Sequence, residues 1–299
     1  MADAREQSGY RTIWHALRLV HKVHPPREMV NILRELDPAA SQARRAKRVT
    51  RRKYSSPGPN HRHDKLKPFG FPIHGAIDGY SRKVLWLEVV KSNNSPGVPA
   101  HLFLETVKQL KGCPILLGTD RGNENGKMAA MQCFFRANGN DEFAADKSHK
   151  YGTSTRNQRI ENWWSHMRKM RTHWWINFFK DMCSSGTLNL YNEVEKECLW
   201  FCFNGVLSDD LQKVKTSWNS HHIRPSRHDN VSGCPDVLFY LPQRSGGLDN
   251  LQEVSDVQIA EMELQVDARE EENEYQEYFH YLMENEEILN PTTPEVAFN

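Results

Sequence analysis

An apolar run that breaks into a turn around an acidic residue lies near the middle of this 299-residue chain. Residues 114–117 have no polar side chain, which indicates the end of a buried strand. The turn that follows, at 118–125, is rich in Gly and Asn, as strand ends are. Asp120 is therefore predicted to lie just past the carboxyl end of a central strand, where open α/β sheets place their functional groups.

A hairpin is predicted before this strand, and helices before and after it. Residues 71–77 and 83–90 have the pattern of two strands, and Gly79 between them accepts the positive φ of a tight turn. A helix over 97–111 would cross back to the sheet and make the next strand parallel. The other predicted helices cover 127–137, the stretch that opens at 155–164 and carries Glu161, 187–203 and 206–220.

The net charge of +1 conceals an uneven distribution of charged residues. Residues 1–60 contain 13 Lys/Arg against 5 Asp/Glu, whereas residues 249–299 contain one Arg against 15 acids. The basic part indicates a polyanionic partner, and the acidic end predicts a mobile tail. We expect neither a membrane span nor secretion, and six scattered cysteines predict reduced thiols.

Residues 74–90 (HGAIDGYSRKVLWLEVV), the Asp120 turn and the helix of Glu161 together resemble the integrase core. This is the retroviral-integrase and transposase branch of the ribonuclease H-like fold. The resemblance implies an α/β fold with a mixed sheet flanked by helices. It also implies that two Asp and one Glu hold two Mg²⁺ or Mn²⁺ ions for DNA strand transfer. Asp120 and Glu161 match the second and third acids, and Asp78 matches a turn residue that binds no metal.

The first acid of the resemblance falls where the sequence is shortened. In the family, a strand with the pattern Trp-His-x-Asp-Gly-x-Asp-Lys-Leu follows the linker that Gly58-Pro59-Asn60 matches, but here His61 follows it directly. Aligned from the C-terminal side, Asp64 matches the later Asp and the metal ligand is lost. Aligned from the N-terminal side, Asp64 stands at the metal position. Similarity favours the loss, which predicts an impaired site.

Positively charged side chains are predicted to contact DNA in two segments. Residues 42–53 have seven positive charges, which would repel one another along a helix. DNA phosphates next to these side chains would relieve that repulsion. The start of the helix that carries Glu161 also favours a phosphate. The predicted contacts are Arg44, Arg45, Lys47, Arg48, Arg51, Arg52, Lys53, Arg156, Arg159, Lys169 and Arg171. The run at 42–53 equally fits a nuclear-import signal or an exposed linker.

Two further motifs allow a functional and a structural interpretation. The pairs Trp163-Trp164 and Trp174-Trp175 would stack on unpaired bases or pack in the core, and helical spacing favours the core for one member of the first pair. Cys198 and Cys202 share a helical face, which suits zinc, but cysteines next to Trp200 favour the core.

The sequence divides into four predicted parts. These are a partial helix-turn-helix-like segment with a basic linker (1–56), an integrase-like core (57–180), a helical extension (181–248) and an acidic tail (249–299). We expect a nuclear DNA-binding protein of transposable-element origin with an impaired polynucleotidyl transferase site. It would form homo-oligomers in one interpretation and would use no membrane or small-molecule cofactor. The alternatives are a non-catalytic DNA- or chromatin-binding protein, and an interaction module whose acidic tail blocks the basic region.

Overall fold

The computed structural model of the chain describes residues 65–92, 95–152, 158–225 and 231–266, with isolated positions at 18, 21–23, 277, 279, 280 and 283. The basic run at 42–53, Asp64 and Arg156 lie outside the described residues, as does almost all of the predicted helix-turn-helix-like segment. No described helix is both long and apolar enough to span a membrane.

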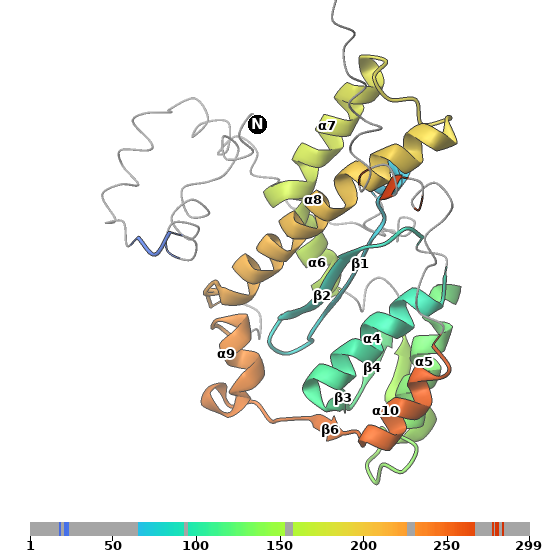
Figure 1. Cartoon of the computed structure of the whole chain (residues 1–299). Coiled ribbons are helices and arrows are strands. Elements are labelled where there is room, and N and C mark those ends of the chain that lie inside the picture. The colour runs from blue at the N-terminus through green and yellow to red at the C-terminus, as the bar shows by residue number, and fades with distance from the viewer. Residues whose placement is uncertain are drawn as a thin grey trace, which may run out of the picture.

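The described elements are helices and six short strands (Figure 1). In chain order they are η2 (Lys67–Phe69), β1 (Ile73–Ile77), β2 (Val84–Val89), α4 (Gly97–Leu110), β3 (Gly112–Pro114), β4 (Leu117–Thr119), η3 (Asn123–Asn125), α5 (Gly126–Phe135), η4 (Ala145–Ser148), β5 (His149–Tyr151), α6 (Gln158–Met167), η5 (Arg168–Thr172), α7 (His173–Ser184), α8 (Glu193–Ser220), α9 (Pro235–Tyr240), η6 (Pro242–Ser245), β6 (Leu251–Glu253) and α10 (Asp256–Glu263).

The predicted hairpin is confirmed as the antiparallel pair β1–β2. Its turn is organised by Asp78, whose Oδ2 accepts hydrogen bonds from the Ser81 backbone N at 2.6 Å, the Ser81 Oγ at 2.6 Å and the Tyr80 backbone N at 3.1 Å. A short polar side chain that bonds the backbone two residues further on is what a turn of this kind requires. Asp78 is therefore a turn residue, as the sequence predicted, but the positive φ expected at Gly79 lies at Arg82 (64°) instead.

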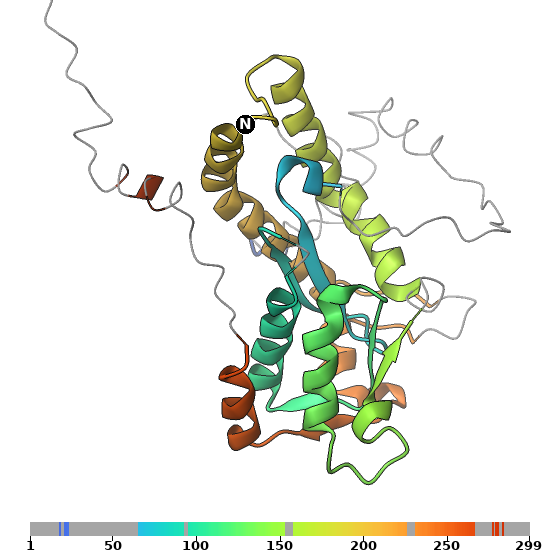
Figure 2. The same ribbon diagram turned by 90° about the vertical axis from the view of Figure 1, so that its right-hand side faces the viewer.

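The two faces of the hairpin contact different apolar clusters. On one face, Ile73 and Leu87 pack with the buried residues of α6, α7 and α8. On the other, Trp86 packs with α4, α5 and α10. Figure 2 shows the hairpin between these two groups of helices. This alternation follows from the period of two along a strand, and it buries both faces of the hairpin.

The described strands form three separate two-stranded sheets instead of the single mixed sheet that the sequence predicted. β1 pairs antiparallel with β2, β3 pairs antiparallel with β6, and β4 pairs parallel with β5. The strand predicted at residues 114–117 is also displaced, because Leu116 is 36% exposed and only Leu117–Thr119 pair with β5. Within the described residues, no ladder joins β1 to β4.

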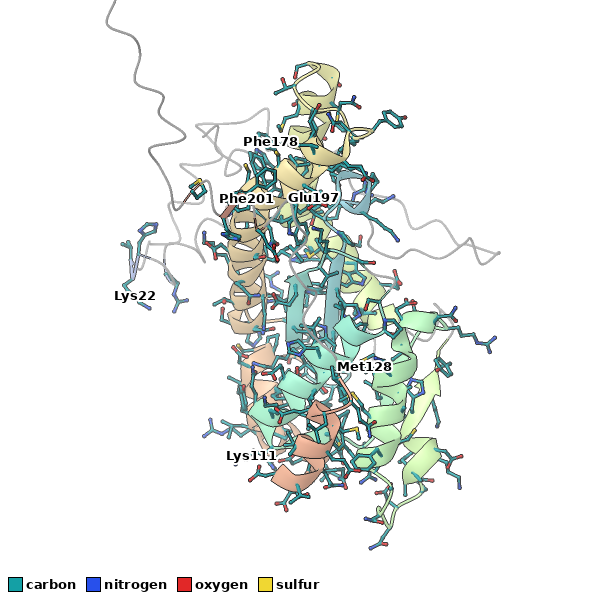
Figure 3. The ribbon with its side chains drawn as sticks, turned by 45° about the vertical axis from the view of Figure 1, so that its right-hand side comes forward. Lys22, Lys111, Met128, Phe178, Glu197 and Phe201 are labelled. Carbon is teal, nitrogen blue, oxygen red and sulfur yellow. The ribbon has the colours of Figure 1, made fainter. Side chains whose placement is uncertain are left out.

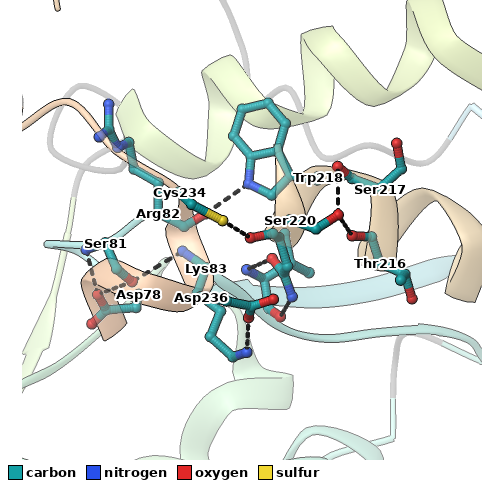
Figure 4. A network of polar contacts seen from close by, with 12 residues as sticks. Asp78, Ser81, Arg82, Lys83, Thr216, Ser217, Trp218, Ser220, Cys234 and Asp236 are labelled. Atoms are coloured by element: carbon teal, nitrogen blue, oxygen red, sulfur yellow. Dashed lines mark hydrogen bonds and ion pairs between the residues drawn. The ribbon is translucent and has the colours of Figure 1, made fainter. Parts of the chain in front are cut away.

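Helix α8 covers the outer edge of β2 with side-chain hydrogen bonds. Asn219 accepts from the Val84 backbone N at 2.8 Å and donates to the Val84 carbonyl at 2.9 Å. Gln212 donates to the Leu87 carbonyl at 3.2 Å. These side-chain amides form hydrogen bonds with backbone N–H and C=O groups of β2 that could otherwise pair with another strand. The turn end of the hairpin is held as well, since Trp218 donates to the Arg82 carbonyl at 2.7 Å and Lys83 pairs with Asp236 (Figure 4).

Three features of the helices and the C-terminal part differ from the sequence predictions. α8 is one helix from Glu193 to Ser220, whereas two helices separated at residues 204–205 were predicted. α6 continues through the π-helical η5 into α7, so this helical segment crosses the predicted boundary at 180/181. β6 pairs with β3, and α10 packs on α4, so the beginning of the acidic part, residues 251–263, has a fixed place in the fold.

Candidate functional site

Asp120 directly follows β4, at the strand end that the sequence predicted. Its Oδ1 accepts a hydrogen bond from Asn125 Nδ2 at 2.6 Å and a longer one from the Gly122 backbone N at 3.4 Å. Asn125 is only 5% exposed, so its amide is a fixed donor. Hydrogen bonds of this kind orient the Asp120 side chain at the end of the strand.

His74 of β1 lies within electrostatic range of Asp120. Burial lowers the pKa of His74 from 6.5 to about 4, and the charge of Asp120 opposes that shift only in part. Trp86 Nε1 donates to His74 Nδ1 at 2.9 Å. Because Nδ1 accepts, the neutral imidazole carries its proton on Nε2. His74 is therefore a neutral imidazole of fixed tautomer whose electrostatic environment includes Asp120.

A second histidine approaches the same strand end from β5. His149 Nε2 lies 2.9 Å from Thr119 Oγ1, and Thr119 Oγ1 donates to the Asp120 carbonyl at 3.1 Å. Burial lowers the pKa of His149. The His149 ring also meets the ring of Tyr151 edge-on at 4.5 Å, and Tyr151 is 49% exposed. The strand ends of β4 and β5 thus combine a carboxylate, an imidazole and an exposed aromatic ring.

Glu161 lies in the first turn of α6 and is partly buried. α6 packs against β1 at Gly75, where a Cβ atom would stand 2.8 Å from Cη2 of Trp164. Asp120 and α6 therefore approach consecutive residues of β1, namely His74 and Gly75. Successive strand residues face opposite sides of a sheet, so the hairpin lies between the His74 contact and the Trp164 contact.

The acidic side chains do not assemble into a metal centre among the described residues, which contain no group of three or more His, Cys, Asp or Glu able to hold an ion. Hard divalent cations need several oxygen ligands, which two carboxylates on different elements provide only in part. The described residues therefore do not fit a complete two-metal site. Asp64, the predicted third ligand, lies outside the described residues.

The predicted DNA contacts are only partly described. Arg159 and Lys169 lie in α6 and η5, but their side chains are outside the described set. Arg171 Nε lies 3.5 Å from Asp210 Oδ1, and Asp210 Oδ2 also accepts from Trp175 Nε1 at 3.1 Å. The charge of Arg171 is therefore partly compensated by α8, with 36% of its side chain exposed.

The Trp pairs belong largely to the interior. Trp163, Trp164 and Trp175 are 3%, 8% and 5% exposed. Trp174 is partly buried and stacks on Phe178, with ring centroids 5.2 Å apart. These contacts favour the core interpretation over stacking on bases.

Four residues around Asp120 were not singled out from the sequence: His74, Asn125, Thr119 and His149. The one available signal was Asn125, because Asn in a Gly-rich turn after a strand-end Asp is a common side-chain donor. His74 and Trp86 lie on adjacent antiparallel strands, and their hydrogen bond depends on a register that one sequence does not specify. The sequence therefore predicted the strand-end position of Asp120 but not the residues that surround it.

A comparison with protein families gave one match. A family model described as integrase core domain matches residues 54–239, which is more than half of the chain. The matched range contains Asp120, Glu161 and the hairpin. The comparisons with curated proteins and with solved structures gave no match.

Proposed function

The chain belongs to the integrase core domain family, and from this premise we propose that it is a DNA-binding protein with an impaired polynucleotidyl transferase site. The observation that carries the proposal is the position of Asp120, which directly follows β4 and is oriented by Asn125. A single oriented carboxylate at a strand end, in a chain of this family, is what remains when a metal site has lost a ligand.

Asp120 and Glu161 are the carboxylates that match the family's metal ligands, although their elements approach opposite faces of the hairpin. Carboxylates supply the oxygen ligands that Mg²⁺ and Mn²⁺ prefer, and such ions would supply electrostatic stabilisation to a phosphodiester. The described residues provide too few ligands for a complete site. The proposed ancestral architecture is the ribonuclease H-like fold, with β1, β2, β4 and β5 as parts of one former sheet.

DNA binding would depend on the basic part of the chain rather than on this site. Residues 1–60 contain 13 Lys/Arg against 5 acids, which is the charge that a polyanion requires. The same residues support our proposal of a nuclear location. A non-catalytic DNA- or chromatin-binding protein is the second candidate, and the lack of a complete ligand set among the described residues favours it over an active enzyme.

The test measures binding and cleavage on the same labelled duplex. Binding should weaken at least about tenfold between roughly 50 and 200 mM salt, because phosphate contacts release counterions. Slow nicking with Mn²⁺ or Mg²⁺ is expected for the wild type, and Asp120→Asn and Glu161→Gln should abolish it. Asp146→Asn is the matched control, since Asp146 is exposed in η4.

The outcomes separate the two candidates. Nicking that Asp120→Asn removes and Asp146→Asn keeps supports the impaired enzyme. Salt-sensitive binding without any nicking supports the non-catalytic protein. Binding that is absent at the lowest salt would refute both, because each candidate requires a DNA-binding surface.

A further inference from the structure

Helix α8 has apolar side chains on its outward face as well as on its buried face. The buried face contains Leu199 and Leu207, which are 3% and 0% exposed. The outward residues, which we call the outer stripe, are Val194, Cys198, Phe201 and Cys202. They recur at intervals of about one helical turn, so they lie on one side of the helix. Val194 is 45% exposed, and Cys202 is also exposed.

The centre of the outer stripe contacts residues from the far end of the chain. The ring centroid of Phe201 lies 5.4 Å from that of Phe279 and 5.0 Å from that of His280. Phe279 is partly buried, and both residues have helical backbone conformation, as do Glu277 and Met283. Figure 3 labels Phe201 on α8 and Glu197, which lies about one helical turn before it.

The sequence around Phe279 has the pattern of one face of a helix. Tyr275, Phe279 and Leu282 are spaced by four and three residues, and glutamates occupy many of the positions between them. A short helix of this kind is marginal in water by itself and forms when its apolar face packs on a surface. The outer stripe is such a surface.

Electrostatic attraction does not account for this contact. The first turns of α8 carry Glu193, Glu195 and Glu197, of which Glu197 pairs with Lys91 at 2.6 Å. Burial raises the pKa of the Cys198 thiol, and the charges of Cys202, Glu195 and Glu197 add to that rise. Lys91 compensates Glu197, and Lys196 lies in the same turns, so the surroundings of the outer stripe carry little net charge. Charge therefore gives the acidic segment no strong attraction to this surface, and apolar packing is the main contribution.

We infer that the outer stripe of α8 is a docking surface for an amphipathic helix, and that its occupant is the segment of this chain around Phe279. The docking holds the acidic tail on α8 through apolar contacts, with Phe279 on Phe201 as the anchor. This arrangement differs from a tail that folds back on the basic region by charge. It is independent of the proposed function, since it involves neither Asp120 nor DNA.

Hydrogen exchange of the tail amides in the full-length protein tests the inference. In the wild type, the amides of Glu277, Phe279, His280 and Met283 should exchange more slowly than those of an unfolded segment, because the packing of Phe279 on Phe201 protects them. Phe201→Ala should make them exchange at least about tenfold faster, although the substitution lies far away in the sequence. Lys213→Ala is the control on the same helix, since Lys213 is exposed on α8 about three turns beyond Phe201. The protection of α8 in the same samples reports whether the helix remains folded.

Salt distinguishes the apolar contact from an electrostatic one. Raising the salt concentration screens interactions between charges, so the protection of the same tail amides should stay the same or increase. Loss of protection at high salt would show that the tail is held by opposite charges, and it would overturn the inference. Equal exchange in the wild type and Phe201→Ala would overturn it as well.

Discussion

The hydrogen bonds between Asn219 and β2 allow a quantitative prediction. Asn219 is 5% exposed, and its amide satisfies both the N–H and the C=O of Val84 on the outer edge of the hairpin. Asn219→Ala leaves two buried backbone groups without these partners. Each such group costs about 1–3 kcal/mol, so we expect the free energy of unfolding to fall by about 2–4 kcal/mol, with some relief if water enters.

The assay is urea unfolding followed by tryptophan fluorescence. Asn177→Ala is the matched control, because Asn177 is exposed on α7 and should change the free energy of unfolding by no more than about 0.5 kcal/mol. The dependence on urea concentration should be the same in both variants and the wild type, so that the midpoints are comparable. An Asn219→Ala midpoint equal to that of Asn177→Ala would refute the reasoning, since the two hydrogen bonds would then contribute nothing.

Three further predictions concern the hairpin and its neighbours. The folded state lowers the pKa of His74 to about 4, so the unfolded chain binds the proton more tightly and stability is lost as pH falls from about 6.5 towards 4. The loss of unfolding free energy is at most about 3 kcal/mol. The variant His74→Asn keeps an acceptor near the position of Nδ1, and it should reduce the fall in the urea midpoint between about pH 7 and 4.5. Gly75→Ala should destabilise the fold by about 1–3 kcal/mol, and by less together with Trp164→Phe, in a double-mutant cycle of unfolding free energies. Arg136→Met removes the ion pair with Asp141 and a 2.7 Å hydrogen bond to Gln252 of β6, so the β6 amides should exchange faster; unchanged exchange would show that Arg136 does not hold this strand.

Local signals in the sequence were sufficient for the elements that depend on neighbouring residues. The hairpin could be predicted from the Asp78-Gly79 turn, because the hydrogen bonds of this turn lie within a few residues of Asp78. The helix predicted at residues 97–111 is confirmed by α4. The strand-end position of Asp120 was also predicted, since it depends on a local change from apolar residues to a turn.

Contacts between distant residues were not predictable in the same way. Two helices were predicted on either side of residues 204–205, but the buried face of α8 continues from Leu199 to Leu207, and packing overrides the local preference. The pairing of β6 with β3 places an acidic C-terminal segment in the fold, although composition alone predicted mobility. The separation of the strands into three sheets depends on which edges meet, which residue patterns do not specify.

The missing ladder between β1 and β4 has a mechanical consequence for Asp120. Where two strands share backbone hydrogen bonds, the distance between the strands is fixed to a few tenths of an ångström. Side chains at the ends of those strands are then held at a fixed distance as well. Here, within the described residues, side chains such as Ala76 and Leu117 in one apolar cluster join the two strands. A change in the distance between Asp120 and the hairpin would therefore repack side chains but break no backbone ladder between β1 and β4.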